Sequence, residues 1–129
     1  MATIEKFEDL EIWQKARTIC VFVEYLFENT ALGKRYSLMN QMERSSGSIM
    51  DNIAEGFERN GNREFINFLS IAKGSCGEVK SQNYRAFDKN LITEEQFNHL
   101  NNLTEIERNK IGAMMNYLNN CELKGLKFK

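Results

Sequence analysis

Apolar side chains recur every three or four residues through most of the chain. In the first such stretch Ile12, Ala16 and Ile19 keep the spacing that is typical of an amphipathic helix. Proline, which interrupts helices, is absent. The pattern therefore predicts an all-α protein, an antiparallel up-down-up-down four-helix bundle that forms one domain over residues 1–129. The predicted helices span roughly residues 9–30, 37–58, 62–90 and 94–122.

Residues that end helices separate these stretches. Gly56 and Gly61 bracket the predicted end of the second helix, where glycine adopts the left-handed conformation without strain. Asn62 follows as the expected N-cap of the third helix. The segment Thr93–Gln96 fits a capping box, in which the two outer side chains satisfy each other's backbone donors. Short joins between long helices are therefore expected.

Several apolar residues lie away from the face that each helix needs for its core. Monomeric proteins rarely expose large contiguous apolar patches, so this surplus predicts that copies of the chain associate. Scattered single exposed side chains on a monomer are the alternative interpretation. The candidates for the subunit interface are Val21, Phe22, Tyr25, Met50, Phe57, Ile66 and Tyr84.

The overall charge gives no sign of a polyanionic partner. The formal net charge is −1 and the pI is about 5.9, so any contact with nucleic acid needs a local patch. A basic segment followed by an apolar run is not found at the start, and no stretch of about 18 apolar residues occurs. A cytoplasmic protein without a membrane partner is expected.

Few residues suggest enzymatic or metal chemistry. His99 is the only histidine, so serines such as Ser48 lack a general base and the Glu-x-x-His pairs of di-iron bundles cannot form. Cys20, Cys76 and Cys121 are an odd number without C-x-x-C spacing, and each is interpreted as a reduced core thiol. No catalytic residue, metal ligand or cofactor is therefore expected.

One polar stripe accompanies the buried face of the second helix. Its members are a hydroxyl, two amides, a carboxylate and a guanidinium beside the apolar face. They could fix the end of the helix against a neighbouring helix, or they could line a groove for a ligand or partner. The spacing favours the structural interpretation. The stripe consists of Gln41, Ser48, Asn52, Glu55 and Arg59.

Two features inside the later helices also receive structural interpretations. Glu107 faces inward between apolar positions, and Asn83 on the third helix is a possible partner for its carboxyl group. Gly74 and Gly77 match no phosphate-binding loop and predict close helix packing instead.

The third helix and its entry carry a net positive charge, whereas the first and fourth helices are net acidic. Basic residues on one helix could contact phosphates, or they could pair with acidic helices of another subunit. The sequence leaves both possibilities open. The candidates for nucleic-acid contact are Arg59, Arg63, Lys73 and Lys80.

Three segments resemble the four-helix-bundle family named after 23S rRNA intervening sequences: FEDLEIWQKA, SGSIMDNIAEGFER and REFINFLSIAKGSCGEV. The similarity covers nearly the whole chain, and its members are bacterial and are often labelled ribosomal proteins. It extends to the accessory variability determinant of diversity-generating retroelements, a pentamer that engages nucleic acid. The resemblance implies a homopentameric ring, and the family's motif residues match Ser48, Asn52, Glu55, Gly56, Ser75 and Glu78.

Together these observations predict a non-enzymatic, homo-oligomeric bundle that serves as a binding or scaffold module in an RNA or nucleoprotein setting. The alternative is a direct RNA-binding protein that uses the basic residues of the third helix. A remote alternative is an enzyme with Glu55 or Glu78 as its general base, although no nucleophile, metal cluster or cofactor motif accompanies either carboxylate.

Overall fold

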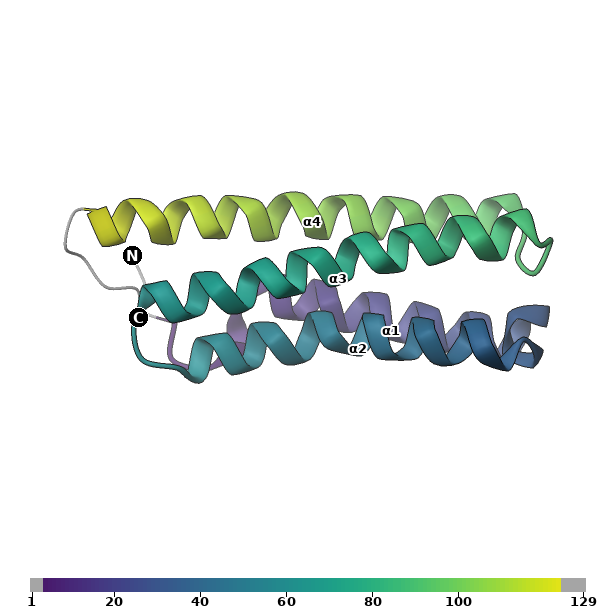
Figure 1. The fold of residues 1–129 in the computed structure, drawn as a ribbon, viewed down its shortest axis with the longest axis horizontal. Coiled ribbons are helices and arrows are strands. Elements are labelled where there is room, and N and C mark those ends of the chain that lie inside the picture. The colour runs from purple at the N-terminus through teal and green to yellow at the C-terminus, as the bar shows by residue number, and fades with distance from the viewer. Residues whose placement is uncertain (1–3, 124–129) are drawn as a thin grey trace.

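Four long antiparallel helices form the bundle in a computed structural model that describes residues 4–123 (Figure 1). The all-α, up-down-up-down prediction is confirmed, and the described residues contain no strand. Residues 1–3 and 124–129 of the predicted domain lie outside the described part. The elements are η1 (Phe7–Asp9), α1 (Glu11–Asn29), η2 (Ala31–Lys34), α2 (Tyr36–Glu58), α3 (Asn62–Asp88) and α4 (Glu94–Leu123).

Each helix packs against two neighbours, so the bundle has two opposite outer faces that matter below. One is formed by α2 and α3, and the other by α1 and α4 (Figure 1). The predicted apolar rows meet inside, where Ile19, Ile49 and Leu69 are fully buried. None of the described helices is long and apolar enough to cross a membrane.

The helix ends confirm the predicted capping box and correct the predicted N-cap of α3. The capping box forms, because the Thr93 hydroxyl accepts from the Gln96 backbone N–H and the Gln96 side chain accepts from Thr93 N–H. Asn62 is not the N-cap of α3 but its first residue, and Gly61 takes the capping position with φ +90°. α2 ends at Glu58, between Gly56 and Gly61 as predicted, but only Gly61 has a positive φ, and Gly56 lies buried inside the helix.

The glycines do not all serve close packing as predicted. A Cβ on Gly56 would lie 2.6 Å from the Cβ of Phe68, so this glycine lets α3 approach α2 closely. Gly74 and Gly77 are exposed, and a Cβ on either would meet nothing within 4 Å in the described structure. The prediction that these two glycines pack tightly is therefore wrong for the single chain.

Candidate functional site

A polar groove runs along the seam between α2 and α3, on the side where the polar stripe was predicted. It has a volume of about 400 Å³. Both helices contribute their hydroxyl, amide and charged side chains to it, because each places a polar row directly beside its buried apolar row. The lining residues of this polar groove are Gln41, Arg44, Ser45, Ser48, Glu78 and Gln82.

Hydrogen bonds between buried and half-buried side chains lie along the polar groove. The Ser48 and Ser75 hydroxyl oxygens are 2.8 Å apart across the seam. The Asn52 amide donates to the Ser48 hydroxyl at 2.9 Å and to its carbonyl at 2.8 Å. Further along, the Ser45 hydroxyl donates to the Gln82 side-chain oxygen at 2.6 Å. Buried polar groups need such partners, so this network supports a structural role for the stripe.

The rim of the polar groove carries separated charges. Arg85 donates to the Gln41 side-chain oxygen at 2.9 Å and so closes one end. Arg44 on α2 and Glu78 on α3 form no ion pair within the described residues. The polar groove therefore offers hydrogen-bonding groups and two unpaired charges of opposite sign, but no nucleophile with an adjacent base.

Gly56 among the family motif residues allows the close approach of α3, and the other five divide into three structural roles. Ser48, Asn52 and Ser75 form the hydrogen-bonded seam, and Glu78 lies on the rim of the polar groove. The remaining acidic member, Glu55, is exposed and lies outside the groove lining. The sequence placed Ser48, Asn52 and Glu55 on one stripe of α2, but it did not reveal the second hydrogen-bonded pair of the seam, Ser45 and Gln82.

Glu55 instead forms a surface ion pair with Arg59, whose guanidinium nitrogen is 2.8 Å from the carboxylate. The two residues are one helical turn apart, and the Arg59 guanidinium also lies 5.0 Å from the ring centre of Phe68. Exposed pairs of this kind contribute little to stability. The predicted structural role of Glu55 is therefore limited to the surface at the end of α2.

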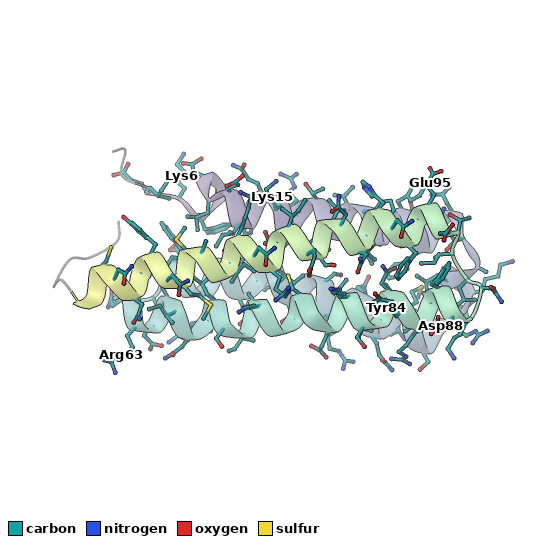
Figure 2. All side chains as sticks on the ribbon, turned by 90° about the horizontal axis from the view of Figure 1, so that it is seen from above. Lys6, Lys15, Arg63, Tyr84, Asp88 and Glu95 are labelled. Carbon is teal, nitrogen blue, oxygen red and sulfur yellow. The ribbon has the colours of Figure 1, made fainter. Side chains whose placement is uncertain are left out.

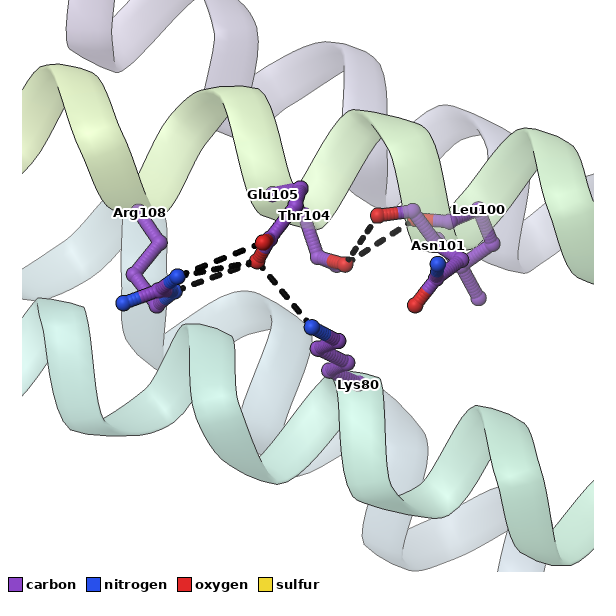
Figure 3. Close-up of polar contacts among 6 residues, drawn as sticks. All are labelled: Lys80, Leu100, Asn101, Thr104, Glu105 and Arg108. Carbon is purple, nitrogen blue, oxygen red and sulfur yellow. Dashed lines mark hydrogen bonds and ion pairs between the residues drawn. The ribbon is translucent and has the colours of Figure 1, made fainter.

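Lys80 and Arg59, which are candidate nucleic-acid residues, are paired with carboxylates. Lys80 is 3.1 Å from Glu105, which also accepts from Arg108 at 3.1 Å (Figure 3). Hydrogen bonds from these two cations lower the pKa of Glu105. Together with the Arg59 pair at the end of α2, this arrangement leaves less free positive charge on α3 and its entry than the sequence suggests. Of the other two candidates, Arg63 is exposed and Lys73 is half-buried.

The structure exposes some of the candidate interface residues and covers others. Val21, Tyr25 and Tyr84 are 64%, 45% and 47% exposed. The remaining four, Phe22, Met50, Phe57 and Ile66, are half-buried and pack against the chain's own core. The sequence interpretation missed other exposed apolar side chains, although the same helical spacing places them outside the core rows. These are Tyr36, Ile71, Ile106 and Tyr117.

Glu107 is the most unusual buried group. Its side chain is 0% exposed, and neither carboxyl oxygen has a hydrogen-bond partner among the described residues. Burial raises its pKa from 4.5 to about 8, while nearby Lys15 opposes that rise. The expected partner was wrong, because the Asn83 amide donates to the Phe97 carbonyl at 2.9 Å instead. Glu107 is thus an inward-facing acid that does not line the polar groove.

The three cysteines are free thiols, but only one belongs fully to the core. Cys76 is buried, and its desolvation raises the pKa to about 12. Cys20 and Cys121 are half-buried, which corrects the expectation of three core thiols. The Cys20 thiol donates to the Ser46 carbonyl at 3.3 Å. Among the described residues, no group of three or more acidic, cysteine or histidine side chains is placed to hold a metal ion.

The fold and the polar groove define a small four-helix-bundle protein whose distinctive chemistry lies in side-chain hydrogen bonds between helices. The chain belongs to the family of the 23S rRNA-intervening sequence protein, since the model of that family matches residues 8–116. The predicted family is therefore confirmed. No curated protein matches the chain.

A solved structure supports the fold independently. The chain is similar to a protein of unknown function from the S23 ribosomal protein family of Bacteroides thetaiotaomicron, with a TM-score of 0.73 and 23% identity. The alignment covers 81% of this chain and 97% of that one. At this identity the likeness shows that the two proteins share the bundle architecture.

Proposed function

We propose that the protein is a non-enzymatic, homo-oligomeric bundle that acts as a binding or scaffold module in an RNA or nucleoprotein setting. The observation that carries this proposal is the exposed apolar surface. Val21 and Tyr25 stand out from α1 with 64% and 45% of their surfaces exposed, and Phe22 lies beside them. Apolar surface gathered in this way is a frequent mark of protein association. The name of the family, 23S rRNA-intervening sequence protein, supports the proposed setting.

The assembly that we propose is a ring of five copies, as the family resemblance implies. A closed ring needs two different surfaces on each subunit, because every copy contacts one neighbour on each side. The bundle has two such opposite faces, formed by α1 with α4 and by α2 with α3. Its polar seam would keep α2 and α3 rigid, so that the subunit presents a constant shape to its neighbours.

Light scattering coupled to size-exclusion chromatography tests this proposal directly. We expect an assembled mass that is a multiple of 15.0 kDa, and five copies give the predicted ring. Val21→Ser with Tyr25→Ser should reduce that mass while leaving the helical content unchanged. Since both side chains are exposed, this double variant removes surface contacts without opening the core. A wild-type protein that stays monomeric at high concentration would contradict the proposal.

Direct RNA binding is the second candidate, supported by the basic residues on α3. Arg59 and Lys80 already pair with carboxylates, so RNA would have to displace both ion pairs. Lys73→Ala with Arg63→Ala removes the two remaining candidates. Gel-shift titration against structured rRNA fragments at two salt concentrations should show weaker binding by this variant and a steep loss with salt. Absence of binding by the wild-type protein at low salt rejects this candidate.

Catalysis by Glu55 or Glu78 has less support than either binding role. Glu55 is exposed and paired with Arg59. Glu78 shares the polar groove with Ser45 and Ser48 but forms no hydrogen bond to either hydroxyl, and no metal-binding group occurs among the described residues. A general base acts only when its substrate proton lies within hydrogen-bond reach. A turnover that disappears in Glu78→Gln would be required to favour this role.

A further inference from the structure

An aromatic pocket opens on the face formed by α1 and α4, near the end of α1 and the start of α4. Its volume is about 400 Å³. The Phe22 ring stacks on Tyr25 with 5.6 Å between ring centres and meets the edge of His99 at 4.5 Å. Glu95 on the first turn of α4 projects outward at this end of the bundle (Figure 2). The lining residues of this aromatic pocket are Phe22, Tyr25, Glu95, Gln96 and His99.

The chemistry of the aromatic pocket suits a positively charged side chain. The faces of aromatic rings carry a negative potential that attracts ammonium and guanidinium groups. The Glu95 carboxylate adds a full negative charge at the rim, and no lysine or arginine lines the pocket. A phosphate group would be repelled by the same carboxylate. The lining of the pocket therefore favours a cation over an anion such as phosphate.

The opposite face of the same chain carries cations without carboxylate partners. Arg44 lines the polar groove between α2 and α3, and Arg85 is held only by the neutral Gln41 side chain. Lys89 follows the last turn of α3. Within the described residues, none of these three cations forms an ion pair. The polar groove also carries Glu78, so the charge complementarity is local and lies between these cations and the Glu95 carboxylate on the other face.

We propose that the aromatic pocket receives the Arg44 side chain of a second copy of this chain. Arg44 suits the pocket better than Arg85, which already donates to Gln41, or Lys89, because a planar guanidinium stacks on aromatic rings. Val21, exposed on the same helix as the pocket, adds an apolar contact at its edge. This inference rests on the proposed homo-oligomer and assigns the surfaces that join its subunits.

The relation between the two surfaces sets the kind of assembly. The aromatic pocket and Arg44 lie on opposite faces of one subunit, so the contact is head-to-tail. In a pair of subunits, one keeps a free pocket and the other keeps a free Arg44. Such contacts repeat from subunit to subunit and close into a ring when the rotation allows. A symmetric dimer, in which one patch meets itself, would not bring these two surfaces together.

Charge reversal tests the contact. Glu95→Arg and Arg44→Glu should each weaken association by about tenfold or more, because each places like charges together. The double variant Glu95→Arg with Arg44→Glu restores opposite charges and should recover most of the wild-type assembly. Glu94→Arg is the matched control, since it makes the same charge change in the same helical turn but lies outside the pocket lining. The measurement is assembled mass over a dilution series by light scattering.

The outcomes separate this inference from the proposed oligomer. A wild-type protein that is monomeric at every concentration defeats both. If the wild type assembles and neither single charge reversal lowers the assembled mass, only the assigned surfaces are overturned. The same holds if the double variant stays dissociated. Circular dichroism checks that each variant is folded. If Glu95→Arg unfolds, Tyr25→Ser replaces it in the experiment. Tyr25→Ser should weaken assembly, and an unchanged assembled mass would count against the pocket as the contact.

Discussion

Replacing Glu107 with glutamine should remove a large pH dependence from the stability of the fold. The side chain is fully buried and its carboxyl oxygens have no hydrogen-bond partner among the described residues. Burial raises the pKa from 4.5 to about 8. Over the pH range between these values the folded chain keeps a proton that the unfolded chain has released. The free energy of unfolding therefore falls as pH rises through this range.

The magnitude follows from the two pKa values. The stabilising contribution of the neutral acid is complete below about pH 4.5 and is lost as pH rises through about 8. One pKa unit corresponds to about 1.4 kcal/mol, so the loss between about pH 5 and pH 8 is roughly 3 to 4 kcal/mol. Glutamine has nearly the same size and does not ionise. Glu107→Gln should therefore lack this part of the pH dependence.

Denaturant unfolding of both proteins from about pH 5 to pH 8 measures the effect. Protein concentration must be equal in all samples, because association changes apparent stability. The decisive quantity is the difference between the two pH dependences, in which contributions from all other groups cancel. Glu58→Gln, at an exposed carboxylate on α2, serves as the control and should behave like the wild type. Equal pH dependence in wild type and Glu107→Gln would refute the reasoning.

Three further predictions concern packing, the seam and the caps. Gly56→Ala should destabilise the fold by about 1–3 kcal/mol, because the added methyl group would lie 2.6 Å from the Cβ of Phe68 on α3. Gly77→Ala should stabilise the fold by up to about 1 kcal/mol, because its methyl group would meet no atom within 4 Å in the described structure. Equal shifts in thermal unfolding would contradict this. Asn52→Ala should cost about 1–2 kcal/mol in denaturant unfolding and Glu55→Ala under about 0.5 kcal/mol, and the reverse order would disprove the assignment of the seam. Thr93→Ala should cost about 1 kcal/mol by calorimetry, and no change would argue against the capping box.

The helices could be predicted because the apolar period repeats over many residues. The helix ends depend instead on the backbone conformation of individual residues. The apolar period placed all four helices within about two residues of their observed ends. Asn62 was the better N-cap by residue type, yet Gly61 holds that position with φ +90°. Asn90, which also has positive φ, follows the end of α3. Short-range propensity therefore describes helix interiors better than helix ends.

For the candidate site, the sequence predicted which residues share one face of a single helix, but not which residues of another helix they contact. Helical spacing identified Ser48 and Asn52 as one stripe on α2, and the structure places both in the seam. Their partner Ser75 was known only as a family motif residue, because the relative rotation of α2 and α3 decides which side chains meet. For the same reason the inward position of Glu107 was predicted but its partner was not. Asn83 lies on the expected face of α3, and its amide is used at the start of α4.

The two hydroxyl-containing pairs across the α2–α3 seam also determine the register of these helices. Sliding one helix past the other by a single turn, about 5.4 Å, would separate Ser45 from Gln82 and Ser48 from Ser75. Ser45 and Ser48 would keep their partners on α2, but the buried Gln82 and Ser75 side chains would lose theirs, at a cost of roughly 1–3 kcal/mol each. Apolar rows alone tolerate such a shift, because contacts between apolar side chains are not directional and can form in more than one register. The polar pairs therefore allow only one register of α2 against α3, whereas apolar contacts alone would allow several.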